Sequence, residues 1–246
     1  MTTDTATWAE QGYLLVPGVL DADELAELRA ETDRLATLVA TDEEASAHGR
    51  YVAFESEADG YELTSGHARA DQVRMIEPLV DLSPPFAALS RRDALTAPAR
   101  DVLSDDVLLF EDKLNYKLPG GAGFVWHQDW SCCWRAHTDD LVTCFIYLDD
   151  STIENGCLQI LPGSHSEKVV RPFAGESTFR VELADGEQEL VTPLPLEAGD
   201  MVVFDPYLLH YSEPNRTDMP RRAIVYTYSA ARHGDLWRVR YPELAR

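Results

Sequence analysis

Short β-favouring segments separated by turns fill the sequence after residue 107, and this pattern restricts the fold more than any other feature. Apolar and β-branched runs occupy residues 107–118, 123–130, 141–148, 157–161, 201–204, 208–211 and 223–228, with weaker segments at 179–183 and 189–192. Pro119-Gly120-Gly121 and Pro162-Gly163 are among the breaks between them. Many short strands with intervening turns indicate a jelly roll, the double-sheet architecture that cupins also use.

The N-terminal part of the chain carries helical patterns instead. Residues 8–18 predict a short helical turn that runs into a strand, and residues 73–76 predict another strand. Asp21 followed by Glu24 predicts a capped helix that continues to about Val39. A proline-initiated helical region is predicted over residues 84–103.

These patterns together predict a single domain over residues 1–246. The predicted fold is mainly β, a double-stranded β-helix (jelly roll, cupin-like) with supporting N-terminal α-helices. The helical support lies mainly in residues 1–104 and the jelly-roll core in about 107–230. The polar segment 41–70 is either a lid or binding loop, or a disordered segment, and the sequence leaves both open.

Charge and composition exclude several classes of function. The net charge of −22, from 43 acidic and 21 basic residues, opposes nucleic-acid binding because phosphates would be repelled. Residues 1–10 contain no apolar run of a signal peptide, and no apolar stretch is long enough to span a bilayer, so we expect a cytoplasmic protein. The four cysteines lack Cys-x-x-Cys spacing, which argues against zinc or a disulfide framework.

The segment Trp126-His127-Gln128-Asp129-Trp130 carries the strongest candidate chemistry. Alternate side chains of a strand point the same way, so His127 and Asp129 should leave one face together. Two histidines and one carboxylate form the metal site of non-heme Fe(II) oxygenases, which leaves coordination positions open. His210, on a later predicted strand, is the best candidate for the third ligand, and His165 is the weaker alternative.

Four motifs, in this order, resemble the phytanoyl-CoA dioxygenase family of Fe(II)/2-oxoglutarate oxygenases. They are Trp126-His127-Gln128-Asp129, then Glu154-Asn155-Gly156-Cys157-Leu158 with Leu161-Pro162-Gly163-Ser164-His165, then Gly199-Asp200 before Val202-Val203-Phe204, and His210-Tyr211-Ser212 with Arg221 downstream. The similarity extends over about residues 108–228. It implies the cofactors Fe(II), 2-oxoglutarate and O2, with succinate and CO2 as products of cosubstrate oxidation.

The resemblance also assigns roles to individual residues. His127, Asp129 and His210 would be the catalytic iron ligands, and Arg221 would hold the distal carboxylate of 2-oxoglutarate with two parallel hydrogen bonds. Further predicted cosubstrate contacts are Ser212, Gln128 and Arg74, whereas Arg222 should face the other side of its strand. Asp129 occupies the position that a halogenase of this family would leave to a small residue, so halogenation is set aside.

The substrate prediction is a small molecule, with neither nucleic acid nor membrane as partner. The segment 113–121 is similar to family members that hydroxylate free amino acids or aminoalkylphosphonates, and natural-product intermediates are also open. Candidate pocket residues are Trp126, Trp130, Trp134, Arg135 and Asn115. The alternatives are a desaturase, epoxidase or cyclase with the same ligands, and a non-catalytic metal-binding jelly roll. The expected state is a monomer or homodimer.

Overall fold

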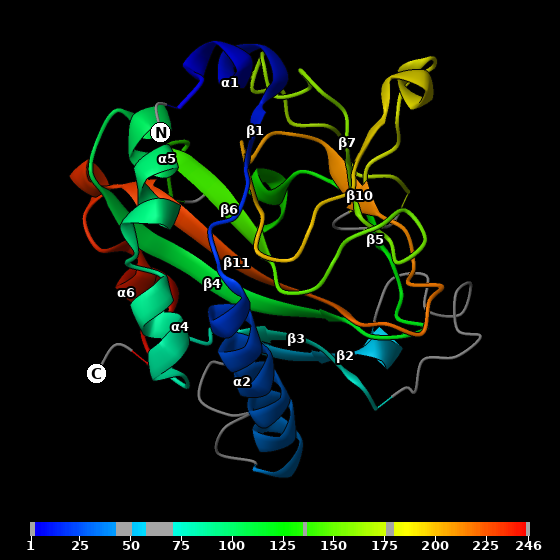
Figure 1. The fold of residues 1–246 in the computed structure, drawn as a ribbon. Helices are drawn as coiled ribbons and strands as arrows, with labels where there is room; N and C mark the ends of the chain where they lie inside the picture. The colour runs from blue at the N-terminus through cyan, green and yellow to red at the C-terminus, as the bar shows by residue number, and fades with distance from the viewer. Residues whose placement is uncertain (1–2, 43–50, 58–70, 135–136, 176–179, 245–246) are drawn as a thin grey trace.

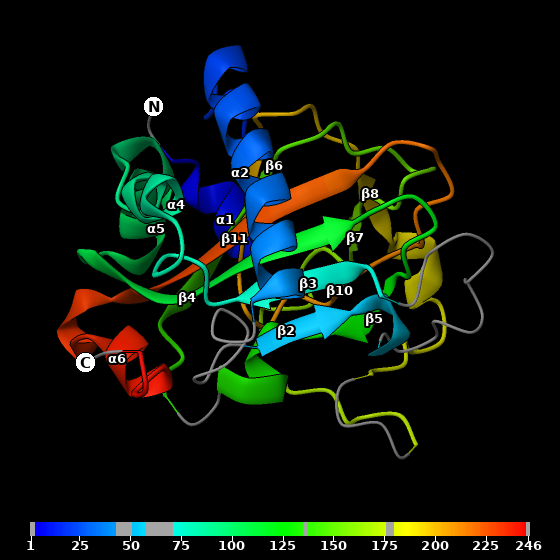
Figure 2. The same cartoon turned by 90° about the horizontal axis from the view of Figure 1, so that it is seen from below.

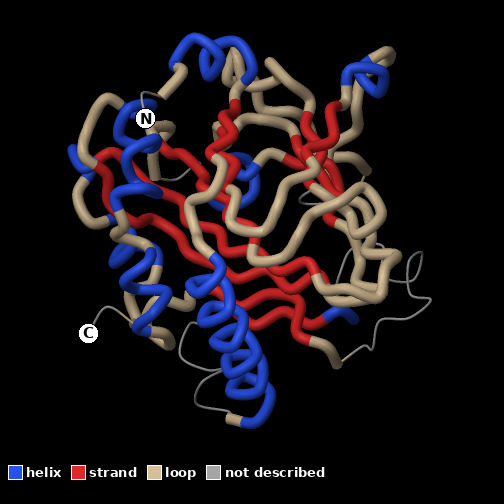
Figure 3. Tube along the Cα trace, viewed as in Figure 1, coloured by secondary structure: helices blue, strands red, loops and turns tan. Residues whose placement is uncertain are grey.

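Two antiparallel sheets form the strand-rich part of the protein (Figures 1 and 3). The computed structural model describes residues 3–42, 51–57, 71–134, 137–175 and 180–244. The larger sheet has the order β1 (Tyr13–Val16), β9 (Met201–Phe204), β6 (Leu141–Tyr147), β11 (Arg221–Ala230), β4 (Val107–Lys117), β3 (Val73–Glu77) and β2 (Tyr51–Phe54). The smaller sheet has the order β5 (Phe124–His127), β10 (His210–Ser212), β7 (Leu158–Ile160) and β8 (Thr192–Leu194). This arrangement confirms the predicted jelly roll.

Helices from the N-terminal part cover one face of the larger sheet (Figures 1 and 2). These helices are α1 (Thr5–Gln11), α2 (Ala22–Thr41), α4 (Pro84–Leu89) and α5 (Asp93–Leu103). A further helix, α6 (Leu236–Arg240), lies at the C-terminal end and packs against a separate cluster with Phe110 and Trp134. The Asp21 side chain accepts the backbone N–H of Glu24 while Glu24 reaches back to the Asp21 N–H, so the predicted capping box is confirmed.

The larger sheet separates two apolar cores because its strands are buried on both faces. On β11, Ile224 and Tyr226 belong to the cluster that packs against α2, α4 and α5. Their neighbours Ala223 and Val225 belong to the cluster between the two sheets, with Leu158 and Ile160 of β7. The strand period of two therefore directs alternate β11 side chains either to the helices or to the space between the sheets.

Several boundaries differ from the sequence predictions. Strand β5 ends at His127, and one π-helical turn covers Trp130–Trp134. Residues 179–183 were predicted as a strand, but their described part forms only an isolated bridge between Phe173 and Val181. The region 84–103 divides into α4 and α5. The strand predicted at 189–192 is displaced, because a 3-10 turn takes Glu187–Leu190 and β8 starts at Thr192.

The described residues of the polar segment 41–70 include a strand that was not predicted. Strand β2 pairs with β3, with Val52 opposite Ile76, and the 3-10 turn Glu55–Glu57 follows it. Residues 43–50 and 58–70 lie outside the described residues, so the lid and disorder hypotheses concern a part of the chain that the structure does not describe.

Candidate active site

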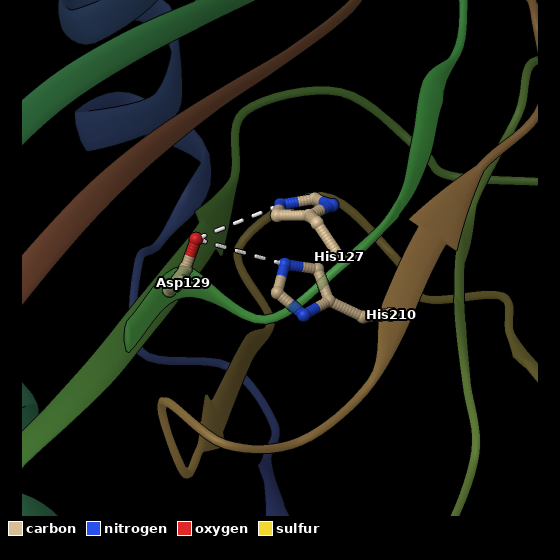
Figure 4. A group of neighbouring side chains, drawn as sticks. All are labelled: His127, Asp129 and His210. Atoms are coloured by element: carbon tan, nitrogen blue, oxygen red, sulfur yellow. Dashed lines mark ion pairs between the residues drawn. The ribbon is translucent and has the colours of Figure 1, made fainter. Parts of the chain in front are cut away.

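Strand pairing brings two histidines together at one end of the smaller sheet. His210 on β10 is the Cα partner of His127 on β5, and the two ring centroids are 4.1 Å apart. Beyond the end of β5 the chain turns and presents Asp129, whose Oδ1 lies 3.6 Å from His127 Nε2 and 3.9 Å from His210 Nε2 (Figure 4). The predicted triad therefore converges, although Asp129 does not share a strand with His127 because the strand has already ended.

Backbone carbonyls orient both imidazole rings. His127 Nδ1 lies 2.7 Å from the Val125 carbonyl oxygen, and His210 Nδ1 lies 2.9 Å from that of Leu208. A carbonyl oxygen only accepts, so each Nδ1 carries the hydrogen and each Nε2 keeps its lone pair toward Asp129. Such hydrogen bonds set the ring orientation and tautomer of metal-binding histidines.

Electrostatics at the triad favour a bound cation. Burial and the neighbouring His127 lower the pKa of His210 to about 4, which keeps this imidazole neutral at neutral pH. Burial acts to raise the pKa of Asp129, but His210 and Lys113 outweigh it and the net pKa is lowered, so Asp129 is a carboxylate. Within the part of the chain that the structure describes, these three residues are the group that could hold a metal ion.

The donor set discriminates among metals. Two imidazole nitrogens and one carboxylate oxygen suit a divalent transition metal, whereas Mg²⁺ and Ca²⁺ prefer oxygen ligands throughout. The absence of a thiolate in this group argues against a structural zinc site of the cysteine type. Three ligands on one side leave positions open for further ligands, so the residues present fit a catalytic iron.

Arg221 provides a buried cation between the sheets. Its side chain is 2% exposed, and its Nη2 donates a 2.7 Å hydrogen bond to the Gly156 carbonyl. Its Nε has no hydrogen-bond partner among the described residues. Burial lowers the pKa of Arg221, which measures the cost of holding this charge away from water. An anionic ligand would compensate that charge and satisfy the open N–H.

Arg222 has a different environment on the opposite face of β11, as the sequence analysis expected. Its Nε and Nη2 bind both oxygens of Asp149 at 2.9 and 3.0 Å, and its Nη1 donates to Thr32 and Asp33. Arg222 is therefore a structural arginine that ties β11 to α2, and Arg221 alone of the pair is directed to the interior between the sheets.

Lys117 is a buried basic residue that the sequence analysis missed. Its Nζ donates to Ser212 Oγ and to the Glu213 carbonyl, both at 2.6 Å, and to the Gly156 carbonyl at 3.3 Å. Burial lowers the pKa of Lys117 well below its usual value, and the nearby positive charges of Arg221 and Arg74 lower it further. A ligand carboxylate at this end of the site would stabilise the charged form of the ammonium group.

Gly156 makes this basic end of the site possible. It adopts φ of +76°, and a Cβ at this position would come within 2.0 Å of the Glu213 carbonyl oxygen. Only glycine combines the left-handed conformation with this close approach. The Gly156 carbonyl can then accept from both Arg221 and Lys117, which explains why the predicted Glu-Asn-Gly-Cys motif contributes to the site.

A cavity of about 360 Å³ joins the triad to Arg221. Its walls come from the inner face of the larger sheet, including Phe145 and Val225, and from the smaller sheet, including Leu158. Of the predicted contacts, Ser212, Asn115 and Trp134 line this cavity. Asn115 Oδ1 is buried without a hydrogen-bond partner among the described residues, so it is available to a ligand.

The structure does not bring Gln128 and Arg74 into the lining of this cavity. The Gln128 amide donates to the Val169 and Tyr207 carbonyls and accepts from the Arg171 N–H, so its polar atoms hold surrounding loops. The Arg74 guanidinium donates to the Ala122 and Gly123 carbonyls and lies 3.9 Å from the Phe124 ring centroid. Because both side chains already bind the protein backbone, the geometry does not support either as a cosubstrate contact.

Two of the predicted tryptophans also lie apart from the cavity lining. Trp126 stacks on Tyr211 with centroids 4.2 Å apart and packs against the Leu161 and Leu209 cluster, because it follows the strand alternation opposite to His127. Trp130 stacks on Tyr207 at 4.9 Å. Arg135 lies outside the described residues.

His165, the alternative ligand, packs against another part of the protein. A Cβ built on Gly12 would come 2.4 Å from His165 Nδ1, so the ring lies directly on the Gly12 backbone. It is not a member of the metal-binding group. This position leaves His210, and not His165, as the third member of the group.

Four charged residues that sequence reasoning missed line the end of the cavity that Trp134 borders. They are Glu77, Glu111, Lys113 and Arg240. Glu111 and Lys113 follow the period of two that also places Asn115 and Lys117 on one face of β4, so strand alternation could have found them. Glu77 on β3 and Arg240 on α6 carry no comparable signal, since only tertiary packing brings them here.

Comparisons with known proteins agree with this geometry. A family model described as phytanoyl-CoA dioxygenase matches residues 8–223. Methylphosphonate hydroxylase from Gimesia maris is 28% identical over 241 residues, which cover 97% of this chain and 84% of that protein. 2-Aminoethylphosphonate dioxygenase from an uncultured bacterium is 33% identical over 135 residues, covering 55% of this chain and 50% of that protein.

The solved structures include EctD from S. alaskensis with 2-oxoglutarate and 5-hydroxyectoine. It superimposes with a TM-score of 0.71 at 25% identity and covers 93% of this chain and 75% of that one. No helix in the described residues has both the length and the apolar character needed to cross a membrane. Because the family match extends over residues 8–223, the chain belongs to the phytanoyl-CoA dioxygenase family.

Proposed function

We propose that the protein is an Fe(II)- and 2-oxoglutarate-dependent dioxygenase that hydroxylates a C–H bond of a small polar molecule in the 360 Å³ cavity. Membership of a dioxygenase family gives the class of enzyme and argues against the non-catalytic alternative. One observation carries the proposal: the His127, Asp129 and His210 group and the buried Arg221 line the same cavity.

His127, Asp129 and His210 would hold the iron. Bound iron supplies the oxidising chemistry, in which 2-oxoglutarate and O2 yield succinate and CO2 and the substrate C–H becomes C–OH. The Leu208 and Val125 carbonyls keep the two imidazoles in the tautomer that can bind a metal. The apolar walls Phe145, Leu158 and Val225 exclude water from the reacting atoms.

Arg221 would anchor the distal carboxylate of 2-oxoglutarate. Its open Nε–H and planar guanidinium suit two parallel hydrogen bonds to a carboxylate. Ser212 lines the same cavity and is held by Lys117 Nζ at 2.6 Å, so the hydroxyl can add a third contact. Arg221 and Ser212 form the proposed cosubstrate site in place of Gln128 and Arg74, and Lys117 positions the Ser212 hydroxyl from behind.

The size of the cavity and the relatives support a small substrate. The cavity must hold both cosubstrate and substrate, and its 360 Å³ is near the lower limit for ligand pockets. The relatives named above act on methylphosphonate and 2-aminoethylphosphonate, by their names, which are small charged molecules. Desaturation, epoxidation or cyclisation would use the same protein groups, and product analysis distinguishes them from hydroxylation.

The remaining predictions concern the whole chain. We propose that residues 1–246 form one catalytic domain, because the N-terminal helices pack on the same sheet that lines the cavity. The cytoplasmic location and the monomeric or homodimeric state stay predictions from the sequence.

An anaerobic titration tests the proposed function. Metal-free protein receives Fe(II) and then 2-oxoglutarate, and a visible charge-transfer band reports the chelated keto acid. We expect the band in wild type, and with Arg221→Met only at much higher 2-oxoglutarate. Arg216→Met is the matched control, because the Arg216 side chain is 72% exposed and lies outside the cavity lining. Absence of the band in wild type would overturn the assignment.

A further inference from the structure

Opposite charges meet at the end of the cavity lined by Trp134. Arg240 of α6 lies between two carboxylates, donating to Glu77 Oε1 at 2.7 Å and contacting Glu111 Oε2. Lys113 of β4 binds Glu111 Oε1 at 2.8 Å. All four side chains are less than 20% exposed, with 13% for Glu77, 2% for Glu111, 18% for Lys113 and 14% for Arg240. Helix α6 therefore closes the cavity with an arginine that belongs to a buried charge cluster.

Glu111 is fully engaged by the protein itself. Its Oε1 accepts from Lys113, and its Oε2 accepts from Trp134 Nε1 at 2.7 Å and contacts Arg240. Glu111 therefore organises the cluster and offers no open oxygen to a ligand. Arg240 is engaged through Nη2 and through Nε, which donates to the Tyr241 hydroxyl at 3.0 Å.

Lys113 keeps hydrogen-bond donors, and Glu77 keeps one acceptor oxygen, that the described residues do not engage. Lys113 Nζ has three donors, and among the described residues only Glu111 Oε1 accepts from it. Glu77 Oε1 accepts from Arg240 and the Tyr241 hydroxyl, while no hydrogen bond from the described residues reaches Oε2. Both side chains line the cavity, and the charge of Glu77 acts on Lys113. The cavity thus presents open cationic donors, including those of Lys113, and the open carboxylate oxygen of Glu77.

The charges of the cluster also balance. Two carboxylates and two basic groups sum to zero, so a ligand with a single charge would leave that charge uncompensated in a buried site. A ligand carrying both charges would give its anionic group to Lys113 and its cationic group to Glu77. The cavity also has to hold 2-oxoglutarate, so the two ligand charges can be separated by only a few carbon atoms.

We propose that the substrate is a small zwitterion, whose carboxylate or phosphonate binds Lys113 and whose ammonium group binds Glu77. This inference rests on the proposed function, because it concerns the substrate end of the same cavity. Arg240 acts as a positioning residue, since its Nη2 contacts both Glu77 and Glu111. Specificity then depends on two charged contacts from different elements, β3 and β4.

Calorimetry on the anaerobic Fe(II)- and 2-oxoglutarate-loaded protein tests this proposal. The probes are glycine, β-alanine, γ-aminobutyrate, aminomethylphosphonate and 2-aminoethylphosphonate, each with a matched amine and a matched carboxylate or phosphonate that lacks one charge. We expect at least one zwitterion to bind about tenfold or more tightly than both matched ions. It should also shift the visible band and increase succinate formation after O2 is admitted.

Two variants assign the contacts. In Lys113→Gln, the zwitterion should bind no more tightly than its matched amine. In Glu77→Gln, the zwitterion should bind no more tightly than its matched anion. Glu77→Gln keeps an oxygen that can accept from Arg240 and Tyr241, and melting temperatures check that both variants fold. Lys168→Gln is the control, because this exposed lysine lies outside the cavity lining.

The results distinguish a wrong substrate assignment from a wrong enzyme assignment. If the band forms but a singly charged probe binds best, or no zwitterion binds, the zwitterion assignment is wrong and the oxygenase stands. If the variants keep the wild-type preference, Lys113 and Glu77 are not the contacts. If wild type forms no band with Fe(II) and 2-oxoglutarate, the proposed function fails and the substrate assignment fails with it.

Discussion

His127 and His210 are cross-strand partners in the antiparallel pair of β5 and β10, although they lie far apart in the chain. Their ring centroids are 4.1 Å apart, and each ring is oriented by the carbonyl of the residue two positions before it. The geometry of the metal group therefore depends on one strand register. A register change by one residue would turn His210 to the other face of the sheet.

Replacing His210 should remove metal binding while leaving the fold intact. We expect His210→Ala to lower Fe(II) affinity by more than about 100-fold, since loss of an orienting group alone costs 10–100-fold. An anaerobic Fe(II) titration measures this loss, and circular dichroism reports the fold. His233→Ala serves as control because His233 pairs with Asp140 at 2.7 Å, outside the cavity lining. Wild-type affinity in His210→Ala would remove this histidine from the metal site.

Replacing Lys117 should weaken cosubstrate binding more than iron binding. Lys117→Met leaves the Ser212 hydroxyl and the Glu213 carbonyl without their buried donor, while the Gly156 carbonyl keeps that of Arg221. We expect the KM for 2-oxoglutarate to rise about tenfold or more, and the free energy of unfolding to fall by about 1–3 kcal/mol. Steady-state succinate assays and urea unfolding measure the two effects. An unchanged KM would show that Lys117 only supports the fold, and Lys168→Met should change neither quantity.

Breaking the ion pair behind the site should affect stability without affecting the chemistry. Asp149→Ala leaves the Arg222 guanidinium buried without its two-bond partner, which should cost about 3–5 kcal/mol in urea unfolding. Replacing both residues together, as Asp149→Leu with Arg222→Met, should recover much of that loss. The charge-transfer titration should stay as in wild type for both proteins. A large loss of 2-oxoglutarate binding in the folded double variant would contradict the separation of Arg221 from Arg222.

Asp205 should make stability depend on pH. Burial raises the pKa of Asp205 to about 6, from 3.8 in an unfolded chain. The folded protein then keeps this proton at pH values where the unfolded chain has lost it, so the free energy of unfolding falls as pH rises from about 4 to about 6. Asp205→Asn removes this titrating group. Between pH 4.5 and pH 7.5, the free energy of unfolding of the variant should therefore fall by about 1–3 kcal/mol less than that of wild type.

Urea unfolding of wild type and Asp205→Asn at the two pH values measures this difference. The asparagine keeps a side-chain oxygen that can accept the Tyr207 N–H, as Asp205 Oδ1 does at 2.8 Å. Asp185→Asn is a matched control, because Asp185 lies on an exposed turn. The same pH dependence in both asparagine variants would mean that Asp205 does not carry the effect.

Local sequence predicted much of this protein because strand and helix signals are short-range. The capping box of α2, the strands β3, β4, β6, β9 and β11, and the pairing of His127 with Asp129 follow from neighbouring residues. The separation of Arg221 from Arg222 follows from the strand period alone. Gln128 was assigned to the cosubstrate by the family resemblance, whereas strand alternation already directed it away from His127, and its amide binds the Val169 and Tyr207 carbonyls.

The sequence by itself determined the ligand types and the jelly-roll class, since each depends on residue identity and local spacing. Only the tertiary structure decided which charges share the cavity. Glu77, Lys113 and Arg240 come from β3, β4 and α6, and no local pattern relates these elements. Their contacts depend on strand register and on the docking of α6 against β4, which are set by burial of side chains distant in sequence.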